Sequence, residues 1–283
     1  MVQIEIKCPS CAKSGIIEVE ANIISSSARG VTAVTVAEYL ICEHSFFAYI
    51  DKNLSVRGVY IADFQLELPD MKLDQKLEDI VIPEVENVDV ILISINIHAD
   101  WLIHIIRGCF YKRKILILSD LEVLNRHLNN FFTYIFKDSF EFNILIEKRE
   151  TYKSKRKDYK EYLIIDEDQV LNDSDKIMKP KTMKIEKAIV QSFLSEPDPK
   201  MSLINTKNEI QKVYQLAETI IELNNDLKEK EELSTKMIID SFKVKYGFTV
   251  GGPYLDLLLE VIMRYFEVEL AMGSGVSDFM SFL

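Results

Sequence analysis

An alternation of apolar runs and amphipathic spans between Asp89 and Glu147 constrains the fold of this chain more than any other feature. The run VDVILISI is followed by a helical span at residues 99–110, the run KILILS, a second helical span at residues 120–137 and the run FEFNILIE. Continuous apolar runs are typical of strands that helices cover on both faces of a sheet. The stretch therefore predicts a three-layer α/β domain, which we place at residues 85–172.

The second helical span carries the clearest pattern. Its apolar side chains recur at helical spacing and form one wide stripe: Leu121, Leu124, Leu128, Phe131, Phe132 and Ile135. A wide stripe is typical of a helix that lies against a sheet. A further strand is expected at residues 161–166, and its acidic end, Asp166-Glu167-Asp168, falls at the carboxyl edge where open α/β sheets bind ligands.

Residues 1–70 predict an antiparallel β module. Val2, Ile4 and Ile6 alternate with polar residues and lead directly into Cys8-Pro9-Ser10-Cys11. Two cysteines with two residues between them, at the tip of a hairpin, can direct both sulfur atoms at one metal ion. This knuckle resembles the first knuckle of a zinc ribbon.

The second half of the metal site is expected at Cys42 and His44, which lie between two strand-like runs. Residues two apart on a strand share a face, so both can bind the same ion. Cys8, Cys11, Cys42 and His44 would complete a closed, structural Zn²⁺ site. The alternative is three reduced cysteines and a surface histidine.

Residues 183–283 predict a helical bundle. The longest helix is expected at residues 202–230, with a further helix at 231–245 and an apolar one from Pro253 to Ala271. The apolar stripe of the longest helix is wider than a coiled-coil seam, which favours packing within a bundle, with a homodimer through these helices as the alternative. Residues 69–86 are rich in charged residues and are predicted to form a linker. The last residues of the sequence include four apolar ones: Phe279, Met280, Phe282 and Leu283.

Composition and charge exclude several classes of protein. The 283 residues carry a net charge of −11, which disfavours a nucleic-acid partner, because phosphate binding needs a surplus of Lys and Arg. We find no signal sequence and no apolar run long enough to span a membrane, so a cytoplasmic protein is expected.

Known catalytic motifs are missing from the sequence. A glycine-rich phosphate loop follows neither the run VDVILISI nor the run KILILS. His98 and Asp100 could form an acid/base pair after the end of a strand. Further candidates for acid/base catalysis are His104, and His127 with Asp120. A Mg²⁺ ion could be held by Asp166, Glu167 and Asp168. Surface or packing roles explain these residues as well, and we predict no catalytic residue.

A basic stretch begins within the central domain and runs toward the carboxyl-terminal helices. Its first part contains Lys153, Lys155, Arg156, Lys157 and Lys160, flanked by Tyr152 and Tyr159, and its second part runs to Lys187. Basic residues with interleaved tyrosines can bind RNA or an anionic membrane. The interpretation we favour is a solvated loop, since acidic residues are interspersed.

Residues 101–136 resemble the central segment of DENN-domain proteins. The resemblance rests on a helix at 102–110, the basic turn Lys112-Arg113-Lys114, a strand that closes with Ser119, and a second helix at 121–136 with an aromatic end. The resemblance implies a partner in a small GTPase system, as an exchange factor, activator or scaffold subunit. Family members usually place a longin-like fold before this segment, whereas residues 1–70 carry a metal knuckle, so no functional residue is transferred.

The sequence as a whole predicts an α+β multidomain protein with three parts, at residues 1–70, 85–172 and 183–283. We expect a non-enzymatic regulatory or scaffold protein that binds a protein partner, within a small GTPase system if the resemblance holds. The competing hypothesis is a nucleic-acid-associated regulator that uses the zinc ribbon and the basic stretch at residues 153–187.

Overall fold

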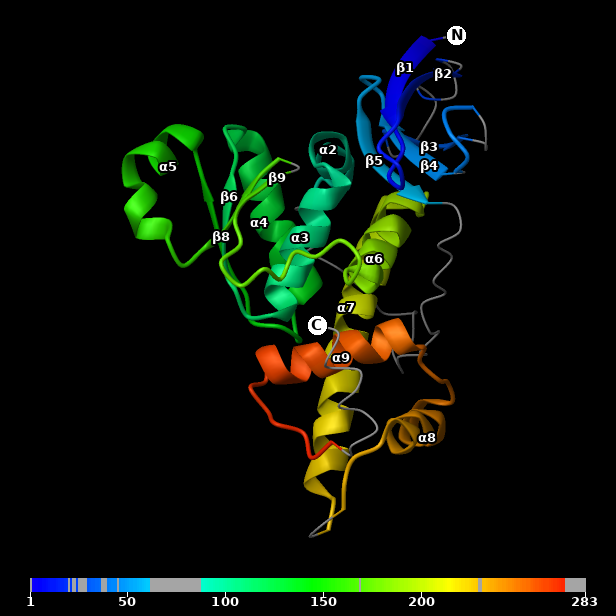
Figure 1. The fold of residues 1–283 in the computed structure, drawn as a ribbon. Helices are drawn as coiled ribbons and strands as arrows, with labels where there is room; N and C mark the ends of the chain where they lie inside the picture. Colours follow the sequence, from blue (N-terminus) through cyan, green and yellow to red (C-terminus); the bar gives the residue numbers. More distant parts are fainter. Residues whose placement is uncertain are drawn as a thin grey trace.

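The computed structural model describes residues 2–19, 21, 24, 30–36, 40–44, 46–61, 88–167, 169–228 and 231–272. Over these residues the chain forms three small sheets and eight α-helices, with a β region first and helices last (Figure 1). This mixed class, with that order of elements, is as predicted. The linker at 69–86, Asp168 and the apolar end at 279–283 lie outside the described residues.

Two antiparallel sheets make up the amino-terminal region. Strands β1 (Val2–Lys7) and β2 (Ser14–Val19) pair as a hairpin, and β3 (Val31–Val36), β4 (Phe46–Asp51) and β5 (Val56–Ile61) form a three-stranded sheet. Side chains of these strands and of the segments beside them share one apolar core: Ile4, Ile6, Cys8, Ile17, Val19, Ile24, Val36, Ile41, Phe46, Ala48 and Ile50. The alternation of Val2, Ile4 and Ile6 with polar residues therefore predicted β1 correctly.

The turn between β4 and β5 is built around one buried carboxylate. Oδ1 of Asp51 accepts hydrogen bonds from the backbone N–H groups of Asn53 and Ser55, both at 2.8 Å, and Oδ2 accepts from Nε of Arg57 at 2.7 Å. A carboxylate that satisfies two backbone amides and a guanidinium is tolerated inside the protein. These bonds hold residues 51–55 in the turn that joins β4 to β5.

The central region contains a four-stranded sheet of order β7-β6-β8-β9. Strands β6 (Lys114–Leu118), β7 (Asn143–Glu147) and β8 (Leu163–Asp166) run parallel, and β9 (Gln169–Asn172), which was not predicted, is antiparallel. Helices α3 (Ala99–Phe110) and α4 (Glu122–Phe136) fall where the apolar periodicity predicted them.

Both faces of this sheet are covered. On one face, Ile115 and Ile117 of β6 belong to the core that includes α3 and α4. On the other face, Leu116 and Leu118 contact Tyr159, which comes from the short helix η3 (Arg156–Tyr159). Because alternate residues of β6 point to opposite faces, a strand buried on both faces has to be apolar throughout.

The run VDVILISI is a helix and not the predicted strand. Helix α2 (Val90–Asn96) begins at Asp89, whose side chain accepts a hydrogen bond from the backbone N–H of Leu92 at 2.8 Å. The buried residues Val90, Ile93, Ser94 and Ile97 follow helical spacing. A short continuous apolar run fits a strand and a buried helix equally well, and here the cap at Asp89 decides for the helix.

The first part of the basic stretch is helical where a loop was expected. Helix α5 (Arg149–Lys155) and η3 follow β7 directly and carry Lys153, Lys155, Arg156 and Lys157. Tyr159 anchors these turns on the face of the sheet, and Tyr152 and Tyr162 pack beside it. The tyrosines between the lysines therefore serve packing.

Four helices form the carboxyl-terminal region: α6 (Lys184–Ser195), α7 (Pro199–Asn225), α8 (Thr235–Tyr246) and α9 (Gly252–Arg264). Oδ1 of Asp198 caps α7 by accepting from the N–H groups of Lys200 and Met201. Helices α6, α8 and α9 all contact α7, and α9 lies across its middle (Figure 1). Helices α7 and α9 end earlier than the sequence predicted, at Asn225 and Arg264.

The stripe that suggested a homodimer is buried within the chain. The heptad positions of α7 that the structure buries fully are Leu203, Ile210, Val213, Ala217 and Ile220. They belong to a continuous core that runs from Val31 through the central sheet to Tyr265. The hydroxyl groups of Tyr49 and Ser195, 2.7 Å apart, also join the amino-terminal sheet to α6. The division into three domains stays a prediction.

One buried ion pair connects the central region to the carboxyl-terminal helices. Nη1 of Arg107 on α3 donates to Oε1 of Glu186 on α6 at 2.8 Å, and the two side chains are 3% and 0% exposed. Nη2 of Arg107 donates to Thr182 and lies 3.5 Å from Oε2 of Glu260 on α9. Burial raises the pKa of Glu186, and the neighbouring Arg107 opposes that rise.

No single helix among the described residues is both long and apolar enough to cross a membrane. The pair α2 and α3 passes together on length and composition, but it bends by 107° at its break.

Replacing Arg107 by Met is expected to lower the free energy of unfolding by about 3–5 kcal/mol, because Glu186 is left buried without its cation. The double variant Arg107→Met with Glu186→Leu should lose less free energy of unfolding than Arg107→Met alone, because it leaves neither Arg107 nor Glu186 as an unpaired charge. Urea unfolding of the four proteins of this cycle measures the coupling, and simple additivity would contradict it. The exposed pair Lys114 and Glu161 is the control, and Lys114→Gln should cost at most about 1 kcal/mol.

Candidate metal centre

The first half of the candidate site lies at the tip of the β1–β2 hairpin. The backbone N–H of Cys8 donates to the carbonyl of Lys13, and that of Ala12 donates to the carbonyl of Cys8, at 2.9 and 3.0 Å. These bonds fold residues 8–13 into a tight loop, in which Ala12 takes a positive φ of 60°. The N–H of Ser10 points at Sγ of Cys8, 3.4 Å away. The loop thus presents the sulfur of Cys8 with amide donors around it.

The second half precedes β4. Sγ of Cys42 lies 3.6 Å from Nδ1 of His44. The ligand atoms of all four predicted residues, Cys8, Cys11, Cys42 and His44, lie within 4.8 Å of one another. In a tetrahedral site with metal–sulfur bonds of about 2.3 Å, neighbouring ligands stand about 3.7 Å apart. The structure therefore brings together the four residues that sequence spacing selected, in an arrangement that could hold a metal ion.

The electrostatics of the cluster differ between its cysteines. Burial by itself would raise the pKa of Cys8, but backbone hydrogen bonds from Cys11 and Ser10 hold that pKa below its ordinary value. Burial raises the pKa of the Cys42 thiol to about 11, and the neighbouring sulfurs of Cys8 and Cys11 add to the rise. Four crowded ligand atoms, three of them thiols, favour a cation between them, since a cation stabilises the thiolates together.

The four candidate ligands differ in their exposure to solvent. Cys8 is buried in the core of the two amino-terminal sheets, Cys42 is half-buried, and Cys11 and His44 are exposed. Four side-chain ligands fill a tetrahedral shell and leave no open position for a substrate. An ion held here would cross-link the β1–β2 hairpin to the segment before β4.

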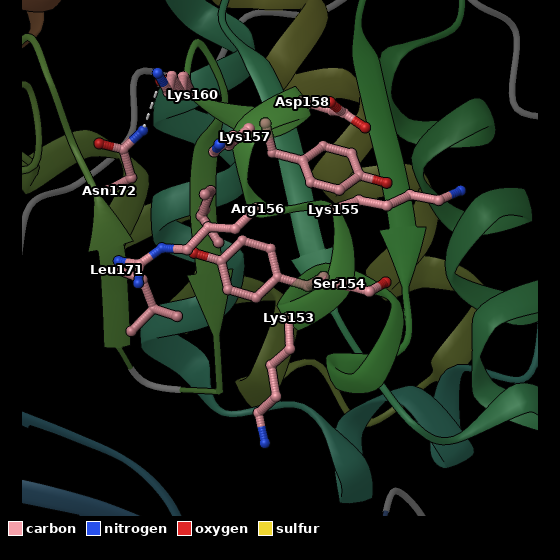
Figure 2. Close-up of a pocket in the computed structure, with 12 residues that line it drawn as sticks. Lys153, Ser154, Lys155, Arg156, Lys157, Asp158, Lys160, Leu171 and Asn172 are labelled. Carbon is pink, nitrogen blue, oxygen red and sulfur yellow. Dashed lines mark hydrogen bonds between the residues drawn. The ribbon is translucent and has the colours of Figure 1, made fainter.

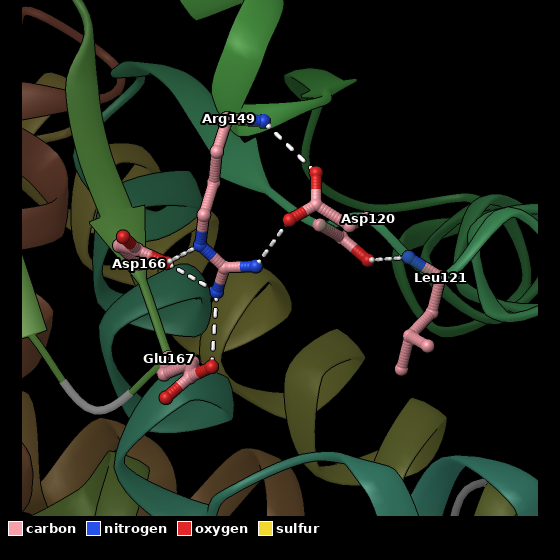
Figure 3. A network of polar contacts seen from close by, with 6 residues as sticks. Asp120, Leu121, Arg149, Asp166 and Glu167 are labelled. Carbon is pink, nitrogen blue, oxygen red and sulfur yellow. Dashed lines mark hydrogen bonds and ion pairs between the residues drawn. The ribbon is translucent and has the colours of Figure 1, made fainter.

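The carboxyl edge of the parallel sheet carries a second polar cluster (Figure 3), of which the sequence predicted the acidic residues but not Arg149. Arg149, directly after β7, donates to Asp120 after β6 at 2.8 Å, to Asp166 at the end of β8 at 2.6 Å, and to Glu167 at 3.0 Å. Its guanidinium lies between Asp120 and two of the carboxylates that the sequence offered as possible Mg²⁺ ligands, Asp166 and Glu167. In this arrangement an arginine supplies the positive charge that a cation would supply.

The candidate catalytic histidines have local structural roles where their contacts are defined. Nδ1 of His98 accepts from the backbone N–H of Asp100 at 3.4 Å and lies 3.7 Å from its carboxylate, so His98 caps α3. Nδ1 of His127 accepts from the N–H of Asp89 at 3.2 Å. His98 borders a cavity of about 540 Å³ that also contains Arg149 and Trp101. The predicted pair His98 and Asp100 is close in space, but its nitrogen is engaged at the helix end.

The basic stretch surrounds a hollow of about 720 Å³ (Figure 2). The residues around it come from α5, η3, β8 and β9 and include Lys153, Lys155, Arg156 and Lys157. Asn172 closes one side, where its side chain donates to the carbonyl of Lys160 at 3.0 Å. The sequence predicted this cluster of charges, and the fold turns it into a concave surface.

Comparisons with known proteins give no family for this chain: no family model matches it, and no curated protein matches it.

The purified protein is expected to contain one metal ion per chain. Cys8→Ser and Cys42→Ser should each abolish metal binding and lower the melting temperature, because each removes a ligand from a set of four. Metal analysis by mass spectrometry with thermal melting measures both effects. Cys109→Ala is the matched control, since Cys109 is buried in the other core and should cost stability without loss of metal.

A second prediction concerns Asp120, whose pKa is held below its ordinary value by hydrogen bonds from Arg149. A depressed carboxyl pKa stabilises the fold above the unfolded-state value of about 3.9, and the contribution is lost as the pH falls through the folded-state value. Arg149→Gln should raise the pKa of Asp120 in a carboxyl-carbon NMR titration. Lys148→Gln should instead raise mainly that of Glu122, its ion-pair partner.

Proposed function

We propose that this chain is a zinc-stabilised, non-catalytic scaffold protein that binds a protein partner. The observation that carries the proposal is the closed set of Cys8, Cys11, Cys42 and His44, whose ligand atoms lie within 4.8 Å of one another. A zinc coordination shell filled by four side chains has a structural role, because catalysis by zinc needs an open coordination position for water or substrate. The region around it then serves as a rigid platform.

Zinc is the metal that this ligand set favours. Three thiolates and one imidazole form a tetrahedral sulfur and nitrogen site, which suits Zn²⁺ and disfavours Mg²⁺ and Ca²⁺, because both prefer oxygen. The ion would stabilise two small sheets whose shared core has few large side chains.

A partner surface is offered by the amino-terminal end of α4. Leu121 and Val123, at the start of this helix, are 54% and 71% exposed, and Glu122 and Arg126 lie exposed beside them. Exposed apolar side chains within a charged surround are typical of protein interfaces. Helix α4 belongs to the span at residues 101–136 that resembles the DENN central segment. The partner class that we propose is therefore a small GTPase.

The second candidate function is nucleic-acid binding through the basic hollow. The concave arrangement of Lys153, Lys155, Arg156 and Lys157 favours an anionic ligand, whereas the net charge of −11 opposes a long polyanion. The proposed partner surface on α4 and the basic hollow lie on different faces of the central sheet. Variants on one face therefore test one function without altering the other surface.

The test measures binding of purified small GTPases from the source organism, loaded with GDP or with a GTP analogue, by biolayer interferometry. Val123→Asp is expected to weaken binding about tenfold or more, since it places a charge in an apolar contact. Val244→Asp is the matched control: Val244 on α8 is 89% exposed and lies outside the proposed surface.

Equal loss of binding in both variants, or no GTPase bound at all, would reject the α4 surface. Binding of single-stranded RNA that falls with rising salt and is lost in Lys153→Gln with Lys157→Gln would establish the second candidate instead.

A further inference from the structure

A cleft of about 640 Å³ lies between β5, α3, α6 and the tip of the cysteine loop. Its volume is in the range of sites for small organic molecules. Pro9 from the cysteine loop, Val59 from β5 and Met183 before α6 supply apolar surface. The cleft therefore joins four stretches that are distant in the sequence, and its lining contains no metal ligand and no residue of the Arg149 cluster or the basic hollow.

Two polar side chains of this cleft have buried atoms without a partner. Tyr60 is 8% exposed, and neither its hydroxyl nor Nδ1 of His104 has a hydrogen-bond partner among the described residues. Buried polar atoms are nearly always paired in native proteins, and each unpaired one needs an explanation. A ligand in the cleft would supply the missing partners.

Both groups are neutral at pH 7. Burial raises the pKa of Tyr60 well above its ordinary value and lowers the pKa of His104. A neutral phenol donates one hydrogen bond and a neutral imidazole either donates or accepts, so the pair suits a polar atom on the ligand and not a charge.

The charged residues at the cleft are mainly basic. Lys181, Lys184 and Lys187 come from the start of α6 and the residues before it, and the one acidic residue in the lining is Asp100. Nζ of Lys187 donates to the carbonyl of Pro180 at 3.0 Å, which holds it at the cleft. In a chain with a net charge of −11, a local excess of lysine around an apolar cleft favours an anionic group at its rim.

We propose that this cleft is a binding site for a small amphipathic anion, with an aromatic or aliphatic body against Pro9, Val59 and Met183, and one acidic group beside Lys181 and Lys187. The hydroxyl of Tyr60 and the ring of His104 bond to a polar atom of the body. This site goes beyond the scaffold function and does not depend on it.

The probe is 8-anilinonaphthalene-1-sulfonate, which combines an aromatic body with one sulfonate. The matched ligand is N-phenyl-1-naphthylamine, which has the same body without the charge. Fluorescence titration of the full chain should give one saturable site for the sulfonate and about tenfold weaker binding of the uncharged compound, because the lysines recognise the acidic group.

Variants then locate the site. Lys181→Gln with Lys187→Gln should weaken binding of the sulfonate about tenfold and leave the uncharged compound unchanged. Tyr60→Phe should weaken binding of the sulfonate about fivefold without lowering the melting temperature, since the hydroxyl has no partner within the described chain. Val59→Trp fills the cleft and should abolish binding of both compounds.

The control is Lys153→Gln with Lys157→Gln at the basic hollow, which should leave both affinities unchanged. If Val59→Trp does not fold, as judged by circular dichroism, Gln191→Trp on α6 fills the same cleft from the other side. Equal affinity for the two compounds, equal loss in the control, or retained binding in the folded cleft-filling variant would each overturn the proposal.

Discussion

A guanidinium and a carboxylate without contact to water set the packing of the whole molecule. Arg107 on α3 and Glu186 on α6 are costly to bury unpaired, so this packing of the helices depends on the contacts of Arg107 with Glu186, Thr182 and Glu260. Helix α6 lies on α7, which contacts α4 and α2. The ion pair thereby fixes the carboxyl-terminal helices relative to the central sheet.

The amino-terminal region has a different central feature, the cysteine and histidine cluster. A two-stranded and a three-stranded sheet share a small core and cannot bury enough apolar surface to be very stable alone. The cluster of Cys8, Cys11, Cys42 and His44 joins both sheets at one point, and Cys8 belongs to the shared core. A metal ion at this point would strengthen the region, and Tyr49 connects the same region to α6 through Ser195.

The carboxyl edge of the parallel sheet, where α/β proteins usually bind their ligands, is filled by Arg149 and its three carboxylates. Buried polar atoms without a partner occur at the cleft beside Tyr60 and His104, and also at Nε1 of Trp101, which lines the cavity beside Arg149. One concave surface with unmet hydrogen-bonding capacity thus lies at the junction of the β module and the helices, a position that no single stretch of sequence defines.

The sequence alone determined the features that depend on local pattern: the helices at Ala99–Phe110 and Glu122–Phe136, the strand at Lys114–Leu118 and the four metal-ligand candidates. Periodicity and ligand spacing are properties of neighbouring residues, so they can be read from the chain. The structure decided that VDVILISI is a helix, because a short apolar run fits a strand and a helix equally well until the cap at Asp89 and the buried face of Val90, Ile93 and Ser94 are seen. It also decided the partners of Arg149 and Arg107, since ion pairs between distant elements depend on strand order and helix packing.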